Sequence, residues 1–131
     1  MIKAVLYRLK NDAALSSLLG VTAEDTRIYP LSSGNLGPCI TYTDSPADGG
    51  HVRQNSLELR ITAQSYSTVR EIEERLNSLL DFKEGSNGDT GWFYGNVNVM
   101  SSMLTGGGEL EMGEVYQRFL VYTIKWRYIN A

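Results

Sequence analysis

Apolar and polar residues alternate without exception from Ser56 to Gln64. The apolar members of this stretch are Leu57, Leu59, Ile61 and Ala63. A period of two is typical of a β-strand that buries one face and turns the other to solvent. We therefore predict a strand here, with its apolar positions in the core.

Directly after this strand the apolar residues change to helical spacing. They are Val69, Ile72, Leu76, Leu79 and Leu80. Spacings of three and four residues place them on one face of an amphipathic helix. Thr68 and Glu71 stand three positions apart, as a capping box requires, and Ser67 is a second candidate cap. The helix is therefore expected to begin within about two residues of this point.

The first twenty residues also predict helix. Apolar side chains share one helical face at Ile2, Val5, Leu6 and Leu9. Asn11 or Asp12 can cap a further helix from Ala13 to Leu19, which Gly20 would end in a left-handed conformation. The segments form either two short helices or one kinked helix.

Further strands and loops follow from local composition. Strands are expected at Ile28–Tyr29, at Cys39–Thr43, over Trp92, Tyr94 and Val97–Met100, and at Tyr116–Tyr128, which reads as the longest. Glycine, proline and polar residues predict loops at Ser32–Gly37, Asp44–Gly50, Lys83–Gly91 and Ser101–Glu114. The fourth of these loops contains three consecutive glycines.

These elements predict one α+β domain over residues 1–131. We expect an antiparallel or mixed sheet of four to six strands, packed on one face by the Thr68–Leu80 helix and the short N-terminal helices. The sequence is 42% hydrophobic and 21% charged, and no apolar run approaches the roughly 20 residues of a membrane span. Arg8 and Lys10 interrupt the apolar residues near the N-terminus, so no signal-peptide core is expected.

The final strand is apolar on both faces for part of its length. Leu120, Tyr122, Ile124, Trp126 and Tyr128 share one side, which is expected to be core. Phe119 and Val121 lie on the other side and need cover. Either the Ser101–Glu114 loop supplies it or a neighbouring subunit does, since exposed apolar patches commonly mark partner sites.

The search for catalytic and metal-binding residues finds no constellation. His51 is the single histidine and follows a Gly-Gly turn, so it is expected at the surface. Cys39 is the single cysteine, which excludes an internal disulfide and suits a reducing cytosol. Glu109, Glu111 and Glu114 are more typical of a solvated acidic loop than of a divalent-metal site. We therefore predict no enzyme activity, no cofactor and no metal.

Several short motifs follow one another in a characteristic order. Leu9-Lys10-Asn11-Asp12-Ala13-Ala14-Leu15 and Leu18-Leu19-Gly20 come first. Arg27-Ile28-Tyr29-Pro30 and Gly37-Pro38-Cys39-Ile40-Thr41-Tyr42 come next, before the long alternating strand, the helix and the C-terminal strands. In this order they resemble the phage tail-completion proteins, a family that includes tail terminators and tail-to-head joining proteins of long-tailed phages and prophages. The resemblance covers essentially the whole chain.

The resemblance implies a structural protein of the virion tail or neck, assembled in the bacterial host cytoplasm. Its subunits would close into a ring, with six as the expected number, that caps the tail tube protein and presents a surface to the head connector protein. DNA would pass through the lumen without specific binding, which suits a net charge of −3. Phe119 and Val121 are candidates for the subunit interface. The loop residues expected to dock a partner are Met103, Leu104, Leu110 and Met112.

Two other classes of function stay open. Trp92, Tyr94 and Tyr42 could line a pocket between sheet and helix, as in a small-molecule-binding domain or a modest enzyme, although such aromatic residues are more often plain core. A regulatory module could instead pair with a partner through an exposed sheet edge.

Overall fold

A computed structural model describes residues 1–30, 37–48, 50–81 and 91–129. Within these residues the chain forms helices and strands in the order α1 (Ile2–Lys10), α2 (Ala13–Leu19), β1 (Ile28–Pro30), β2 (Cys39–Asp48), β3 (Arg53–Ala63), α3 (Tyr66–Leu80), β4 (Trp92–Tyr94), β5 (Val97–Met112) and β6 (Val115–Tyr128). The predicted loops at Ser32–Gly37 and Lys83–Gly91 fall almost entirely outside the described residues.

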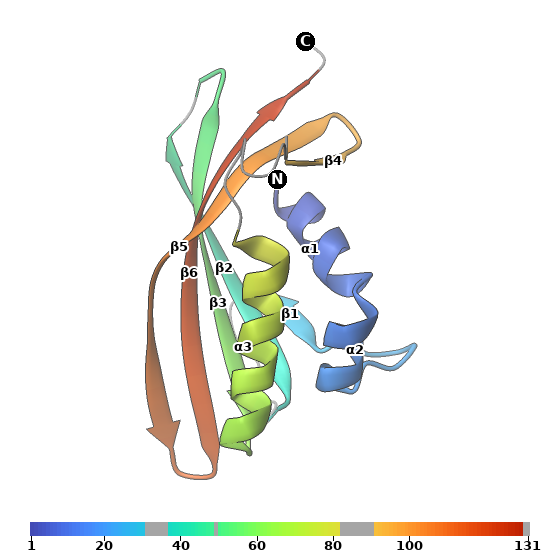
Figure 1. Cartoon of the computed structure of the whole chain (residues 1–131), viewed down its shortest axis with the longest axis vertical. Coiled ribbons are helices and arrows are strands. Elements are labelled where there is room, and N and C mark those ends of the chain that lie inside the picture. The colour runs from blue at the N-terminus through green and yellow to red at the C-terminus, as the bar shows by residue number, and fades with distance from the viewer. Residues whose placement is uncertain (31–36, 49, 82–90, 130–131) are drawn as a thin grey trace.

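The strands form one sheet in the order β1-β2-β3-β6-β5-β4. β1 runs parallel to β2, and every other neighbouring pair is antiparallel. The fold is therefore α+β with a six-stranded mixed sheet over the described residues, as the sequence predicts. Figure 1 shows a strongly twisted sheet with the three helices on one side of it.

The long alternating strand is β3, and its apolar positions are fully buried. Its Leu57 and Leu59 stand opposite Tyr122 and Leu120 of β6, and all four side chains are inaccessible to solvent. The apolar face of α3 joins the same core through Val69, Ile72, Leu76 and Leu80. Tyr122 also donates a hydrogen bond from its hydroxyl to Oδ1 of Asn77 on α3, and burial raises the pKa of this tyrosine.

The start of α3 differs from the prediction. The helix begins at Tyr66 with Ser65 at the N-cap position, and no side chain caps it. The Ser67 hydroxyl lies 2.9 Å from that of Ser65, and Thr68 falls inside the first turn, so the predicted capping box is wrong. Tyr66 instead packs edge to face on Tyr116, with ring centroids 5.7 Å apart, so the first turn of α3 contacts β6.

β2 is longer than predicted, because the stretch from Asp44 to Asp48 continues the strand and is not a loop. Asp44 pairs with Leu57 of β3 and accepts a hydrogen bond from Nδ2 of Asn55 at 2.8 Å. Pro46 is tolerated because β1 pairs only as far as Tyr42, which leaves this part of β2 on an edge.

The C-terminal half of the chain departs furthest from the prediction. Trp92–Tyr94 and Val97–Met112 are two strands of a hairpin rather than one strand, and Gly95 turns between them with φ +58°. The expected loop from Ser101 to Glu114 is almost wholly part of β5, which at 16 residues is longer than the 14-residue β6. Register shifts at Met100 and Thr105 break the alternation of β5, so its strand period is hidden in the sequence.

The N-terminal segment forms two separate helices, and Asp12 connects them to α3. Its carboxylate accepts a hydrogen bond from the Leu15 N–H at 2.8 Å, which caps α2, and another from Nε of Arg75 at 2.8 Å. Gly20 ends α2 in the left-handed conformation, as predicted. The hydrogen bond from Arg75 is the largest of the effects that hold the pKa of the Asp12 carboxyl below its ordinary 3.8.

Asp12→Asn is expected to destabilise the fold more at pH 7 than at pH 3. Because folding lowers the pKa, the charged carboxylate stabilises the protein above pH 3.8 and this contribution is lost as pH falls through the folded-state value. Asparagine keeps the cap but not the ion pair, so we expect a loss of about 1 kcal/mol at pH 7. Urea unfolding at both pH values measures it, with the exposed Glu74→Gln as control. Equal losses at the two pH values would contradict the assignment.

Candidate assembly surface

The outer face of the sheet, defined as the face turned away from the helices, carries Phe119 and Val121. Both side chains are partly buried. Arg60 of β3 stands beside Phe119, with its guanidinium carbon 4.6 Å from the ring centroid, and forms an ion pair with Glu58 at 3.7 Å. A cation over an aromatic ring is attracted by the ring's negative face. The outer face is therefore a mixed apolar and charged surface.

Glycines of β5 keep this surface open beside Phe119 and Val121. Gly108 pairs with Phe119 and Gly106 pairs with Val121. A Cβ atom at position 108 would meet nothing within 4 Å, and one at position 106 would lie 3.7 Å from Cβ of Val121. The two apolar side chains thus have no β5 side chain directly opposite them.

The expected loop over Phe119 and Val121 does not exist. Residues 101–112 lie in the plane of the sheet as part of β5, hydrogen-bonded edge to edge with β6, and a strand in that position does not cover the face of its neighbour. The prediction that the Ser101–Glu114 loop covers Phe119 and Val121 is therefore wrong. Contact with another subunit remains as a proposal.

The four residues expected to dock a partner lie on a strand, not on a loop. Met103 and Leu110 pair with outer-face residues of β6, whereas Leu104 pairs with Tyr122 and so faces the helix side. Their exposed fractions are 45% for Met103, 36% for Leu104 and 49% for Leu110. The side chain of Met112 is outside the described part of the structure. The fold therefore spreads these apolar residues along β5 on both of its faces.

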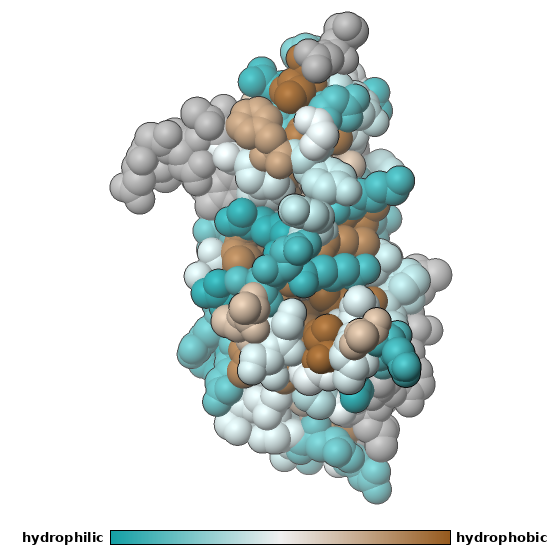
Figure 2. Space-filling model, turned by 90° about the vertical axis from the view of Figure 1, so that its right-hand side faces the viewer, coloured by the Kyte–Doolittle hydropathy of each residue, from teal (hydrophilic) through white to brown (hydrophobic). Residues whose placement is uncertain are grey.

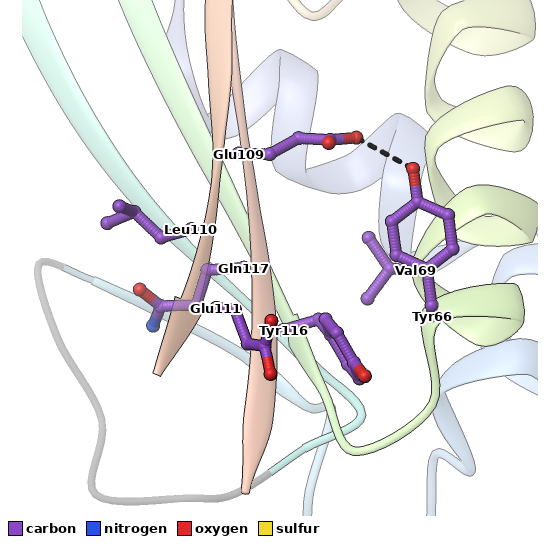
Figure 3. A pocket seen from close by; sticks show the side chains of 7 residues that line it. All are labelled: Tyr66, Val69, Glu109, Leu110, Glu111, Tyr116 and Gln117. Atoms are coloured by element: carbon purple, nitrogen blue, oxygen red, sulfur yellow. Dashed lines mark hydrogen bonds between the residues drawn. The ribbon is translucent and has the colours of Figure 1, made fainter. Parts of the chain in front are cut away.

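A cleft of about 200 Å³ lies on the helix side of the sheet, between the start of α3 and the β5–β6 hairpin. Its lining residues are Tyr66, Val69, Glu109, Leu110, Glu111, Tyr116 and Gln117. Figure 3 shows Glu109 reaching across to Tyr66, while Leu110 and Gln117 point to the other side of their strands. The Tyr66 hydroxyl donates to Oε1 of Glu109 at 3.1 Å. The cleft thus combines tyrosine rings with carboxylates.

Two carboxylates line this cleft, and the arginine beside them binds more closely to a glutamate on α3. Nε of Arg118 lies 2.6 Å from Oε2 of Glu73 on α3, whose side chain is 10% exposed. Nη1 of Arg118 is only a distant partner of Glu109, at 3.8 Å. Among the described residues, Glu111 and Glu114 form no ion pair. The sequence predicts a solvated loop for these glutamates, because nothing local indicates that Tyr66 and Tyr116 meet beside them.

The aromatic residues considered for a small-molecule pocket do not line this cleft. Trp92 and Tyr94 belong to β4 and pack on α1, with the Arg8 guanidinium 4.4 Å from the Trp92 ring and the Tyr7 and Tyr94 rings 5.0 Å apart. Tyr42 packs against the core from β2, and β3, β6 and β5 stand between β2 and β4 in the sheet. The structure therefore gives these three residues no common site.

The remaining candidates for chemistry are isolated. His51 is exposed, as predicted, and burial raises the pKa of the Cys39 thiol. In the described part of the chain no three His, Cys, Asp or Glu side chains gather as metal ligands. None of the helices described has the length and apolar character needed to cross a membrane. On the side formed by α1 and α2, apolar residues appear as separate areas among hydrophilic ones (Figure 2).

No protein-family model matches this sequence. No curated protein matches it either. The fold, however, is similar to that of a solved chain described as "Virion of native gene transfer agent (GTA) particle", with a TM-score of 0.62 and 16% sequence identity. The match covers 93% of this chain and 90% of that chain. At this level of identity the likeness establishes a common fold, so this protein has the fold of a chain found in a virion.

Proposed function

We propose that this chain is a structural virion protein, non-enzymatic, that completes a phage tail by forming a ring between the tail tube and the head connector. The observation that carries the proposal is the common fold with a virion chain over nearly the full length of both. The order of sequence motifs supports the finer assignment to a tail terminator or tail-to-head joining protein. The protein would act in the tail or neck, after assembly in the bacterial host cytoplasm.

The outer face is the proposed subunit interface. A closed ring needs heterologous contacts, in which one patch of each subunit meets a different patch of the next and buries on the order of 800 Å². Phe119 and Val121 are partly buried apolar side chains with an arginine beside them, a composition that interfaces favour at their centre. We place them in this contact, with six subunits as the expected number.

The proposed partners are the tail tube protein and the head connector protein. Met103, Leu104 and Leu110 are the exposed apolar residues of β5 that we assign to these contacts, and Met112 completes the set from sequence. DNA would pass through the lumen of the ring without being held, since the net charge of −3 offers little neutralisation of phosphates. The ring ends tube growth if its far side lacks the surface that tube subunits recognise.

Sedimentation velocity of the purified protein tests the ring directly. We expect a species of about six times the 14.6 kDa chain mass, with little material between monomer and ring because the contacts close only together. The measurement is made over a hundredfold range of concentration, roughly from micromolar upward, and repeated with the tail tube protein present. A stable dimer, or a monomer that stays monomeric with the tube protein, contradicts the proposal.

A further inference from the structure

Among the described residues, no strand pairs with the outer edge of β5 over most of its length. β4 pairs with it only from Val97 to Val99, and beyond that point no described strand lies on the side of β5 away from β6. Figure 1 shows this part of β5 at the margin of the sheet. The N–H of Leu104 donates to Oδ1 of Asp81 at 3.1 Å, so one backbone group of the edge is capped. Residues 105–112 form the open stretch, which we call the β5 edge.

The β5 edge lacks lysine, proline and a described covering element, although it carries a register shift and two glutamates. Natural edges are commonly blocked by lysine, proline or a covering element. The stretch from Thr105 to Met112 contains neither lysine nor proline, and three of its residues are glycines that leave the backbone bare. A register shift at Thr105 bends the strand at the upper limit of the edge but leaves the pairing with β6 regular from Gly106 to Met112. The edge can therefore accept another strand along seven residues.

The two faces next to this edge have opposite chemistry. Glu109 and Glu111 lie on the helix side, where they line the cleft with Tyr66 and Tyr116. Leu110 lies on the outer face with 49% of its surface exposed. Side chains of an added strand alternate between the two faces. The side chains of the added strand that face the helices would thus contact carboxylates and tyrosine rings. Those on the outer face would contact Leu110.

The chemistry of the edge argues against a second copy of this chain as the occupant. The other long open edge of the sheet is β2 beyond Tyr42, which carries Asp44, Pro46 and Asp48. Pairing that edge with the β5 edge would bring aspartates to glutamates and a proline into the ladder. Like charges opposite each other across strands are destabilising, and proline cannot donate to a ladder hydrogen bond.

We propose that the β5 edge binds an extended segment of a different protein, in which lysine or arginine alternates with apolar residues, as an added strand. The basic side chains would enter the cleft between Glu109 and Glu111, where the rings of Tyr66 and Tyr116 can also contact them. The apolar side chains would pack on Leu110. The inference rests on the proposed function in one respect only, namely that the partner is another virion protein.

The test uses a synthetic, end-blocked, fluorescein-labelled peptide in which four valines alternate with three lysines. A second peptide replaces each lysine with glutamate, and a third has the same composition as the first with its lysines in one block. Fluorescence anisotropy is expected to show the alternating lysine peptide binding at least about tenfold more tightly than either control. Hydrogen exchange should show new protection of amides within residues 105–112 and not within β3.

Protein variants separate the edge from general attraction between opposite charges. Glu111→Lys is expected to weaken binding of the alternating lysine peptide by about tenfold or more. Glu74→Lys makes the same charge change at an exposed position on α3 and should change the affinity less than about twofold. The inference would be overturned if the block peptide bound as tightly as the alternating lysine peptide. It would also be overturned if Glu111→Lys and Glu74→Lys weakened binding equally, or if the peptide protected amides outside residues 105–112.

The same samples distinguish this inference from the proposed function. Sedimentation velocity reports the ring, and hydrogen exchange without peptide reports the edge. A ring whose residues 105–112 are already protected without peptide would assign the edge to a second copy and overturn the inference while leaving the ring standing. If the peptide protects residues 105–112 of a protein that never forms a ring, the inference stands and the proposed function is overturned.

Discussion

Phe119→Ser is expected to abolish the ring and leave a folded monomer. Phe119 lies on the outer face, where it contacts Arg60 but fills no space in the helix-covered core. Truncating an aromatic residue at the centre of an interface typically costs about 2 kcal/mol or more, which is roughly a thirtyfold loss of affinity at each contact. A closed ring repeats the loss at every contact, so sedimentation velocity should find monomer at concentrations where the parent is assembled.

Within the monomer, the same substitution should cost about 1–2 kcal/mol, from lost contact with Arg60 and with its neighbours in the sheet. Thermal unfolding at a concentration where both proteins are monomeric measures this separately from assembly. Phe93→Ser is the matched control, because Phe93 is a 56% exposed phenylalanine on β4, two strands away from Phe119 in the sheet. Loss of folding together with assembly would make Phe119 a core residue. An equal loss of assembly in the Phe93→Ser control would contradict a specific role of Phe119 in the interface.

Leu59→Asp is expected to prevent soluble folding altogether. Leu59 has no exposed surface, and it stands between Tyr42 and Leu120 in the middle of the sheet. The substitution removes a buried aliphatic side chain and leaves a carboxylate without a partner in the core. Together these effects cost more than about 4 kcal/mol, a large part of the total stability of a domain of this size.

The matched control for this substitution is Leu110→Asp, on the same sheet. Leu110 is half exposed, so its replacement should leave solubility and the far-ultraviolet circular dichroism spectrum close to those of the parent. Both variants are compared by soluble yield and by cooperative thermal unfolding. If Leu59→Asp melts with the midpoint of the parent, the assignment of the buried face of β3 is wrong.

The two faces of the C-terminal strand show which features the alternation of apolar and polar residues can predict. Its alternation correctly separates buried Leu120, Tyr122 and Ile124 from Phe119 and Val121 on the other face. The pattern cannot say what lies over the second face, because cover depends on segments distant in sequence. The sequence predicts a loop at Met103 and Leu104 for a related reason, since the register shift at Thr105 removes the period that marks a strand.

Local patterns alone determine the long strand β3, the helix α3, the helical character of the first twenty residues and the α+β class, since strong periodicity and turn residues act over a few neighbours. That the N-terminal segment is two helices and not one kinked helix was decided by the structure. Only tertiary pairing decided that glycine-rich residues 101–112 form a strand, because β6 supplies hydrogen-bonding partners that outweigh the weak strand preference of glycine. Tertiary packing likewise brings Tyr66 of α3 beside Glu109 of β5, 43 residues away, and so creates the cleft. Contacts at such separation depend on how whole elements pack, and no short stretch of sequence encodes them.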